Sequence, residues 1–194
     1  MNPTWQQLQE QVSNCNLCAI RSGCHTTVFG AGYRDARVVV IGEAPGATED
    51  ATGLPFQGRA GKLLRKWLYE DIGFQPQDLF VTNILKCRPP NNRDPLTNEK
   101  SNCLPHLTRQ MDFISPKGVL FVGRISANYC LGTNYSMGQL RNSSQQYMGV
   151  FAQAIYHPAF ILRPNGKAYE SLVIQDLLRF KNHLDSLTSF PSRS

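Results

Sequence analysis

The stretch from residue 38 to residue 61 places the strongest constraint on the fold, because a run of β-branched residues there ends abruptly in glycine and proline. Residues 38–41 are Val-Val-Val-Ile, which is typical of a buried strand in a parallel sheet. Five glycines and two prolines follow among residues 42–61, a composition too broken for a helix or a strand. A helix is expected to begin near residues 58–61 and to present one apolar face, formed by Leu63, Leu64, Trp67 and Leu68.

The loop that follows this strand is a candidate binding site. In an open parallel sheet, ligands bind beyond the carboxyl ends of the strands, and the loop begins at such an end. Four of its side chains are therefore expected to surround a pocket: Glu43, Glu49, Asp50 and Phe56. An ordinary strand-to-helix connection is the alternative, but most such connections take only about 2–6 residues.

Composition narrows the class of protein. The chain has 194 residues, 41% of them hydrophobic and 18% charged, which suits one globular domain. The net charge of +6 favours polyanions such as nucleic acid, although many basic proteins bind none. No run of 18 apolar residues predicts a membrane span, and the polar N-terminus lacks an apolar signal region. We therefore expect a cytosolic protein, in which disulfides are rare.

The six cysteines then need another explanation. Cys15 and Cys18 form a Cys-x-x-Cys, and Cys87 and Cys103 lie far downstream. Four thiolates suit either zinc or a [4Fe–4S] cluster, and the residues alone do not separate the two. A redox role for the Cys-x-x-Cys is a weaker alternative, because such a motif usually follows a strand and this one follows an expected helix. Another alternative is that the four cysteines are unrelated. The remaining two cysteines rank below these four as ligands: Cys24 and Cys130.

Periodicity predicts alternating strands and helices along the rest of the chain. Further strands are expected at 79–84, 117–123 and 150–156, and further helices at 4–12, 98–114, 124–131 and 169–184. Residues 30–32 are typical of a turn, and residues 138–149 of a polar loop or small hairpin. This order predicts a single-domain α/β/α sandwich on a mostly parallel four-stranded sheet, spanning residues 1–185 and followed by a flexible tail at 186–194.

Two polar residues lie at the expected carboxyl ends of strands. Asn83 ends the second strand, where a turn or cap role is the alternative. His157 ends the fourth strand and is followed by Pro158, which restricts the backbone where the chain leaves the strand. The other three histidines are expected to be structural.

Several motifs resemble those of the uracil-DNA glycosylases, and most of all the iron–sulfur branch, family four. They are Gly-Glu-Ala-Pro-Gly at 42–46, Gly-x-Pro-Phe-x-Gly-Arg-Ala-Gly at 53–61, Val-Thr-Asn-x-x-Lys-Cys-Arg-Pro-Pro at 81–90 and His-Pro-Ala-x-x-x-Arg at 157–163. The resemblance spans residues 15–163. It implies a [4Fe–4S] cluster held by Cys15, Cys18, Cys87 and Cys103, and hydrolysis of the bond between uracil and deoxyribose in DNA.

The resemblance also implies roles around a flipped uracil. Phe56 would stack on the base, and the Asn83 amide would accept from N3–H and donate to O4. His157 would donate to O2 and stabilise the departing uracil anion, and Glu43 would stabilise the sugar cation or orient water. Better-known relatives place an aspartate where this loop has Ala44, so the residue that activates water is left open.

The remaining implied contacts are to the pocket wall and the DNA backbone. Glu49 would close the pocket near uracil C5, and Gly42 is counted with the substrate-binding residues. Leu162 would fill the gap left by the flipped base, and Arg163 and Arg88 would contact phosphates. The alternative for residues 160–162 is that at least two of them pack in the core.

The expected partner is uracil-containing DNA, single- or double-stranded, bound by a monomer. One related branch traps its substrate covalently through a histidine in an insertion. Residues 87–103 contain no histidine and no such insertion, which favours turnover over trapping. An electron-transfer iron–sulfur protein would not need Phe56, Asn83 and His157 on one rim.

Overall fold

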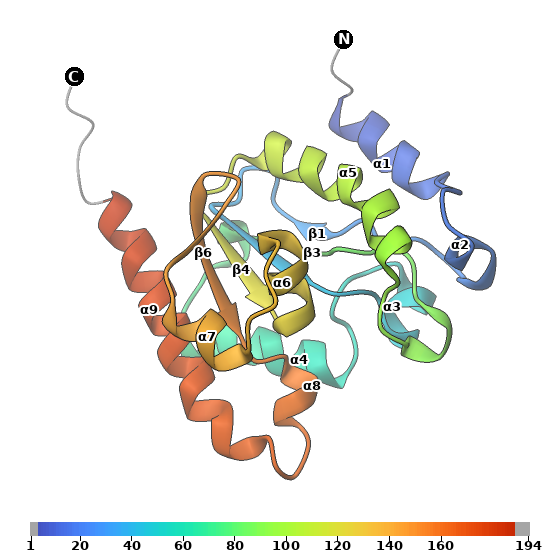
Figure 1. Cartoon of the computed structure of the whole chain (residues 1–194). Coiled ribbons are helices and arrows are strands. Elements are labelled where there is room, and N and C mark those ends of the chain that lie inside the picture. The colour runs from blue at the N-terminus through green and yellow to red at the C-terminus, as the bar shows by residue number, and fades with distance from the viewer. Residues whose placement is uncertain (1–3, 189–194) are drawn as a thin grey trace, which may run out of the picture.

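The computed structural model describes residues 4–188, which form a six-stranded sheet covered by helices on both faces (Figure 1). The spatial order is β1-β3-β2-β4-β6-β5. The strands are β1 Ala31–Gly32, β2 Val38–Gly42, β3 Leu79–Asn83, β4 Gly118–Val122, β5 Gln145–Tyr147 and β6 Val150–Ile155.

The four central strands are parallel, as predicted, and the sheet has two more strands than expected. β3, β2, β4 and β6 pair in parallel. The short strands β1 and β5 add to the two edges in antiparallel orientation. The α/β sandwich is therefore confirmed, with six strands instead of four. The predicted turn at 30–32 contains β1, and β5 forms a hairpin with β6 inside the region expected to be polar loop or hairpin.

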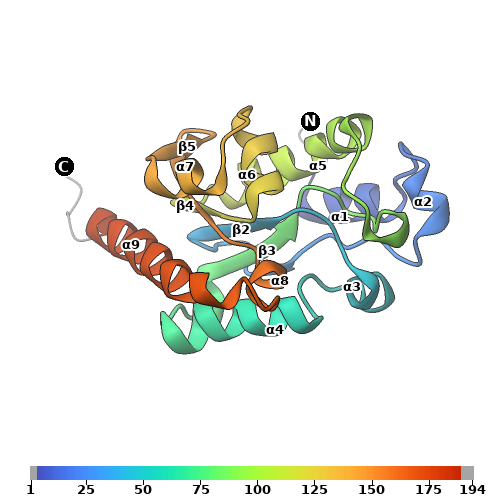
Figure 2. The same cartoon turned by 60° about the horizontal axis from the view of Figure 1, so that its bottom comes forward.

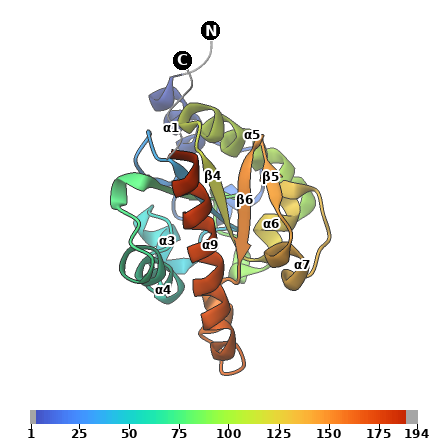
Figure 3. The same ribbon diagram turned by 90° about the vertical axis from the view of Figure 1, so that its left-hand side faces the viewer.

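The helices form two layers. They are α1 Trp5–Ser13, α2 Ile20–Gly23, α3 Ala47–Thr52, α4 Arg59–Arg65, α5 Thr97–Ile114, α6 Arg124–Leu131, α7 Met137–Asn142, α8 Pro158–Ile161 and α9 Glu170–Thr188, and a π-helical segment, Lys66–Asp71, continues α4. Figure 2 shows α4, α8 and α9 on one face of the sheet and α1, α5 and α6 on the other. Figure 3, seen from the side of α9, shows this helix lying beside β4 and β6.

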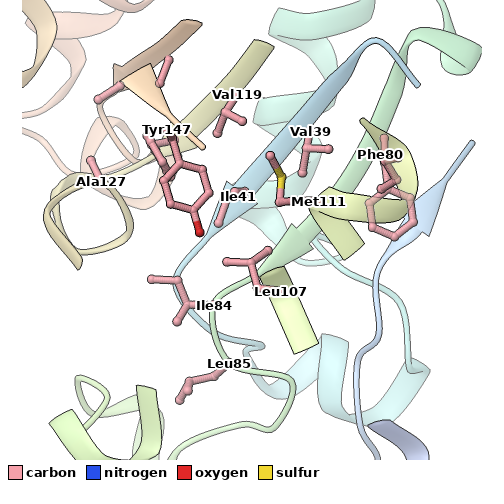
Figure 4. Packing of buried hydrophobic residues seen from close by; sticks show 14 of the residues in the cluster. Val39, Ile41, Phe80, Ile84, Leu85, Leu107, Met111, Val119, Ala127 and Tyr147 are labelled. Atoms are coloured by element: carbon pink, nitrogen blue, oxygen red, sulfur yellow. The ribbon is translucent and has the colours of Figure 1, made fainter. Parts of the chain in front are cut away.

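Strand β2 is buried on both faces, which explains its unbroken apolar sequence. Val39 and Ile41 belong to the core under α5, with Leu107 and Met111 (Figure 4). Val38 and Val40 belong to the second core, which includes side chains of α4 and α9. Because successive side chains of a strand alternate, one four-residue run supplies both cores.

Four helices differ from the expectations. The loop after β2 contains α3, which the glycines and prolines around it concealed. The region 138–149 contains most of α7, and α8 follows directly after His157. The last helix continues to Thr188 instead of ending near 184, while residues 189–194 of the expected flexible tail lie outside the described residues. No helix within residues 4–188 is long and apolar enough to cross a membrane.

Candidate active site

A cleft of about 1250 Å³ opens at the carboxyl ends of the parallel strands. It lies where β2 and β3 end side by side, because Gly42 is the register partner of Asn83. Six of the predicted site residues line it: Glu43, Glu49, Phe56, Asn83, His157 and Arg163. The edge of the sheet predicted to bind a ligand is therefore the edge that carries the cleft.

Gly42 forms the floor between two of these side chains. A Cβ atom at this position would lie 2.3 Å from Asn83 Oδ1 and 2.6 Å from Phe56 Cζ. Both distances are shorter than real Cβ contacts, so any other residue would push the amide and the ring apart. The glycine is thus needed for Asn83 and Phe56 to converge on one point.

Phe56 is held in an unusual backbone conformation. Its φ angle is 53°, a left-handed value that is uncommon for a bulky residue, and its ring is buried. The Arg65 guanidinium donates a hydrogen bond to the Phe56 carbonyl oxygen. A Cβ on Gly61 would lie 1.7 Å from the same oxygen, so only glycine fits there. The loop and the start of α4 together set the direction of the ring.

Asn83 is the last residue of β3 and is 2% exposed. Its carbonyl oxygen accepts a hydrogen bond from Lys86 Nζ at 2.9 Å. Within residues 4–188, no protein group hydrogen-bonds to its side-chain amide. The amide therefore keeps one acceptor and two donors for a ligand in the cleft.

His157 has a fixed tautomer. It is the N-cap residue of α8, and its Nδ1 accepts a hydrogen bond from the Ala159 backbone N–H at 3.1 Å. Nδ1 therefore carries no proton, and in the neutral ring the proton is on Nε2. Burial, with a contribution from Arg163, lowers the pKa of His157 to about 4, so the ring is neutral at pH 7 and Nε2–H is a donor. The ring centroids of His157 and Phe56 are 6.3 Å apart.

Glu43 has the properties of a carboxylate that can hold or release a proton near neutral pH. Burial, with the nearby charge of Asp94, raises its pKa to about 7, and Lys100 opposes this shift. Among the described residues, none hydrogen-bonds to its carboxylate oxygens. Its backbone is fixed by the hydrogen bond from Leu85 N to Glu43 O at 3.0 Å.

Glu49 and Asp50 bind backbone amides. Glu49 Oε2 accepts from Gly46 N at 3.0 Å, and its Oε1 accepts from the amides of Gln57 and Gly58 at 2.7 and 2.8 Å. Asp50 Oδ1 accepts from His25 N at 2.8 Å and Thr26 N at 3.2 Å. The predicted role of Glu49 near uracil C5 stays a prediction. The geometry adds a second role for Glu49, which ties α3 to the Phe56 loop.

The residues expected to contact DNA differ in how close they lie to the cleft. Arg163 is exposed and lines the cleft. Leu162 is 42% exposed just outside it, whereas Ile161 is buried and Phe160 packs on the second core, as the alternative for this segment expected. Arg88 does not line the cleft, and its Nε donates to Asn92 Oδ1 at 2.8 Å.

The loop at 89–94 forms another wall of the cleft and was not predicted to line it. Its position depends on Arg93, whose guanidinium makes two hydrogen bonds, of 2.8 and 2.6 Å, to the buried Glu99 carboxylate. Glu99 also accepts from Leu96 N at 2.8 Å at the start of α5. Along the chain, this loop is preceded by Cys87 and followed by α5.

The four predicted ligand cysteines line one cavity, on the other side of the β3 end: Cys15, Cys18, Cys87 and Cys103. Four thiols are soft donors that suit zinc or an iron–sulfur cluster. Arg21 and Glu99 line the same cavity, whereas the Lys86 amine is hydrogen-bonded to Thr82, Asn83 O and Gln110. The donor set therefore fits such a group. In the described part of the chain, no three His, Cys, Asp or Glu side chains are close enough to hold a metal ion as they stand.

One neighbour of this cavity agrees with the expectations, and one differs from them. Cys24 does not line the cavity, in agreement with its lower rank, although its thiol adjoins Cys87 and, after burial, helps to raise the pKa of that thiol. His106, expected to be structural, lines the cavity with its Nε2 3.4 Å from Cys15 Sγ, and its buried Nδ1 has no hydrogen-bond partner.

Lys86 is the residue that sequence reasoning missed most clearly. Its side chain is 2% exposed, and burial lowers its pKa to about 8. The available signal was a lysine that follows two apolar residues and directly precedes a candidate ligand, in Ile84-Leu85-Lys86-Cys87. A lysine is almost never buried without a specific reason.

Comparisons with known proteins agree with this geometry. Residues 29–178 match the family model of the uracil DNA glycosylase superfamily. The chain is 40% identical over 169 residues to the type-4 uracil-DNA glycosylase of Sulfurisphaera tokodaii, with 82% of this chain and 77% of the relative covered. It is 32% identical over 179 residues to that of Thermotoga maritima, with 91% and 93% covered. For the Archaeoglobus fulgidus relative the identity is 39% over 171 residues, with 83% and 85% covered. The chain therefore belongs to the uracil DNA glycosylase superfamily, in its type-4 branch.

Proposed function

We propose that this protein excises uracil from DNA by hydrolysing the bond between uracil N1 and the deoxyribose carbon, which leaves an abasic site for repair. The observation that carries this proposal is the convergence of the free Asn83 amide and the Phe56 ring above Gly42 in the cleft. A flipped pyrimidine needs both an aromatic face and a polar group that matches its pairing edge.

Asn83 supplies the matching edge for uracil. Its side-chain oxygen accepts from N3–H, and its NH₂ donates to O4. Cytosine presents an acceptor at N3 and a donor at its amino group, so at least one polar pair would be mismatched in a closed pocket. The left-handed Phe56 and the glycine at 42 support this arrangement, because they let the ring and the amide lie close together at the end of β2.

His157 acts on the leaving group. As the glycosidic bond breaks, the base becomes an anion and the sugar gains positive charge. Nε2–H of the neutral ring donates to uracil O2 and stabilises the anion as it forms. The hydrogen bond from Ala159 N to Nδ1 supports this role, because it keeps the proton on the opposite nitrogen before the base arrives.

Glu43 acts on the sugar side of the bond. Its carboxylate stabilises the sugar cation or orients the attacking water. The raised pKa and the absence of protein partners among residues 4–188 support this role, because both leave the carboxylate available to water. Ala44 offers no functional group for this purpose, so Glu43 is the candidate base of the motif.

The four cysteines hold a [4Fe–4S] cluster in this proposal. The cavity that the four thiols share supports the cluster, because thiolates are the usual ligands of iron–sulfur clusters. When bound, the cluster would supply a rigid, electron-carrying group that joins the N-terminal segment to α5. Metal analysis of purified protein should find iron, with broad visible absorption; zinc without iron would refute the cluster. Cys24→Ser and Cys130→Ser are the controls and should keep the colour.

Contacts to the DNA backbone are assigned to Arg163 and Arg88, and the wedge to Leu162. The exposure of Leu162 and Arg163 beside the cleft supports their assignment. Action as a monomer in the cytoplasm, on single or double strands, stays a prediction.

The direct test is incubation with an oligonucleotide carrying one uracil, followed by alkali to cleave at abasic sites. We expect cleavage at the uracil position and release of free uracil, and no cleavage of the matched thymine oligonucleotide. A stable protein–DNA adduct without free uracil would instead indicate a trapping protein. Intact uracil DNA at stoichiometric enzyme would refute the proposal.

A further inference from the structure

Lys86 lies between the cysteine cavity and the candidate base-reading residue. It follows the end of β3 by three residues, directly precedes Cys87, and is one of the residues that line the cavity of the four cysteines. Its backbone N–H donates to Cys103 Sγ at 3.3 Å. From there its side chain extends back toward Asn83, the last residue of β3.

The Lys86 amine is surrounded by oxygen acceptors. Nζ lies 2.6 Å from Thr82 Oγ1, 2.9 Å from Asn83 O and 2.7 Å from Gln110 Oε1. The Thr82 hydroxyl has a single proton, which it donates to one of two acceptors, Phe29 O at 3.0 Å or Gln110 Oε1 at 3.3 Å. The amine is therefore the donor to all three oxygens, and three donated hydrogens require an ammonium group.

This ammonium has no carboxylate beside it. Among residues 4–188, no aspartate or glutamate forms an ion pair with Lys86, and its three oxygen partners are neutral. The thiols of the cavity supply the negative charge nearest to it when they are ionised, which binding of a metal group requires. An apolar residue would fill the same volume without the cost of burying a charge, so the charge needs an explanation of its own.

One partner of the ammonium is the peptide that carries the base reader. Asn83 O is held by Lys86 Nζ, and the next two amides are held by the end of β2 and the residue after it: Ile84 N donates to Gly42 O and Leu85 N to Glu43 O, both at 3.0 Å. The backbone is thus fixed directly after the Cα atom from which the Asn83 amide projects. A side chain held to within a fraction of an ångström is what base discrimination requires.

We propose that Lys86 is a positioning residue, whose ammonium fixes the Asn83 peptide and so directs the Asn83 amide at the pairing edge of the flipped base. The inference rests on the proposed function, because it assigns Lys86 a part in the reading of uracil. Lys86 touches no substrate atom in this account. Its loss should therefore weaken recognition of the base and leave contacts to the DNA backbone unchanged.

The test compares Lys86→Met, which keeps a long unbranched side chain without the charge, with wild type on two DNA duplexes. One duplex carries 2′-fluoro-2′-deoxyuridine, whose electron-withdrawing fluorine disfavours the cationic sugar and blocks cleavage. The other carries a tetrahydrofuran abasic analogue, which has no base to read. We expect the affinity of Lys86→Met for the first duplex to fall about tenfold, the loss that a mispositioned buried hydrogen bond causes, with the affinity for the second unchanged.

Arg37→Met is the matched control. Arg37 is a partly buried cation that precedes β2 at the opposite edge of the sheet and pairs with Asp78 and Asp185. Its loss should lower the thermal midpoint without changing the ratio of the two affinities. Iron content and circular dichroism are measured for every variant. If Lys86→Met does not fold, Thr82→Val keeps the ammonium and the core volume, removes one of its three acceptors, and should shift the ratio in the same direction.

The outcomes separate the inference from the proposed function. Wild-type protein that neither prefers the uracil analogue nor excises uracil would refute the proposed function. Wild-type protein that does both, while folded Lys86→Met or its substitute Thr82→Val keeps the wild-type ratio, would refute the role of Lys86. An equal loss of affinity for both duplexes would also refute it, because a merely structural residue would give that result.

Discussion

At the scale of single residues, the cleft combines two groups whose pKa values burial shifts in opposite directions. His157 is fully neutral, with its proton held on Nε2 by the Ala159 amide, and Glu43 is only partly ionised because burial raises its pKa to about 7. A neutral histidine donates a hydrogen bond without giving up its proton. This suits a leaving group that departs as an anion, and it leads to two predictions.

His157→Ala should slow the excision of uracil by about 10²–10³, the usual cost of removing one donor to a developing anion. Binding of uracil DNA should change much less, because the interaction is made mainly in the transition state. Single-turnover rates and a binding titration measure the two quantities. His183→Ala, on the exposed side of α9, is the control and should behave as wild type. An unchanged single-turnover rate for His157→Ala would remove His157 from the mechanism.

The rate should depend on pH through Glu43. Its folded-state pKa of about 7 means that the carboxylate form increases as the pH rises through neutrality. If the carboxylate is the active form, the single-turnover rate rises between about pH 6 and pH 8 and then levels off. The same shift has the opposite sign for stability, because the folded state holds a proton that the unfolded state has lost, so burial of Glu43 destabilises the fold as the pH rises. Glu43→Gln should abolish the rising limb, and a rise that persists in this variant would assign it to another group.

At the scale of elements, the site depends on the loop after β2, for which the glycines and prolines predicted irregular structure. Glu49 organises it by accepting three backbone N–H groups, from Gly46, Gln57 and Gly58. These bonds form α3 and bring the Phe56 segment back toward the end of β2. The loop is therefore a fixed wall of the cleft.

Glu49→Ala should lower the free energy of unfolding by about 1–3 kcal/mol, because three amides lose their acceptor. It should also slow excision, since the Phe56 ring is no longer held over Gly42. Denaturant unfolding and single-turnover kinetics measure the two effects. Glu70→Ala, an exposed glutamate on the π-helical segment, is the control. Unchanged stability of Glu49→Ala would show that the three hydrogen bonds do not hold the loop.

The comparison between sequence and structure has a physical pattern. The parallel strands and the long helices α5, α6 and α9 were predicted because burial of an apolar face leaves a period in the sequence. Helices α3 and α7 and strands β1 and β5 are short, and most of their stability comes from tertiary hydrogen bonds and neighbours, which leave no period. The cleft residues were predicted from motifs at strand ends. Lys86 and the Arg93–Glu99 pair were not, because their hydrogen bonds leave no pattern in the sequence. Asp50 was expected at the pocket, but it does not line the cleft and instead accepts from the amides of His25 and Thr26.

At the scale of the whole molecule, one end of β3 serves two sites. Asn83 faces the cleft, and Cys87 faces the cysteine cavity four residues later. The proposed cluster therefore lies behind the base reader and beside the loop at 89–94. The net charge of +6, with Arg93 and Arg163 lining the cleft, suits a phosphate backbone approaching this edge.

Binding to DNA should weaken steeply as salt is raised, because each neutralised phosphate releases counterions. Arg163→Gln should reduce the slope of log K against log salt by about one. Lys117→Gln, at the opposite edge of the sheet beside the start of β4, should leave the slope unchanged. Affinity that stays constant between low and moderate salt would contradict nucleic acid as the partner.

The central claim is that the cleft reads uracil through Asn83, and Asn83→Asp tests it most directly. An ionised aspartate repels uracil O4 and accepts from the cytosine amino group, and a protonated one also donates to cytosine N3. The measurement is the yield of abasic sites on matched oligonucleotides with uracil or cytosine at one position. We predict that the variant loses most activity on uracil and gains weak activity on cytosine, first in mismatches and single strands, where flipping costs least. A variant that still prefers uracil by the wild-type margin would contradict the account and leave Asn83 as a strand-end cap.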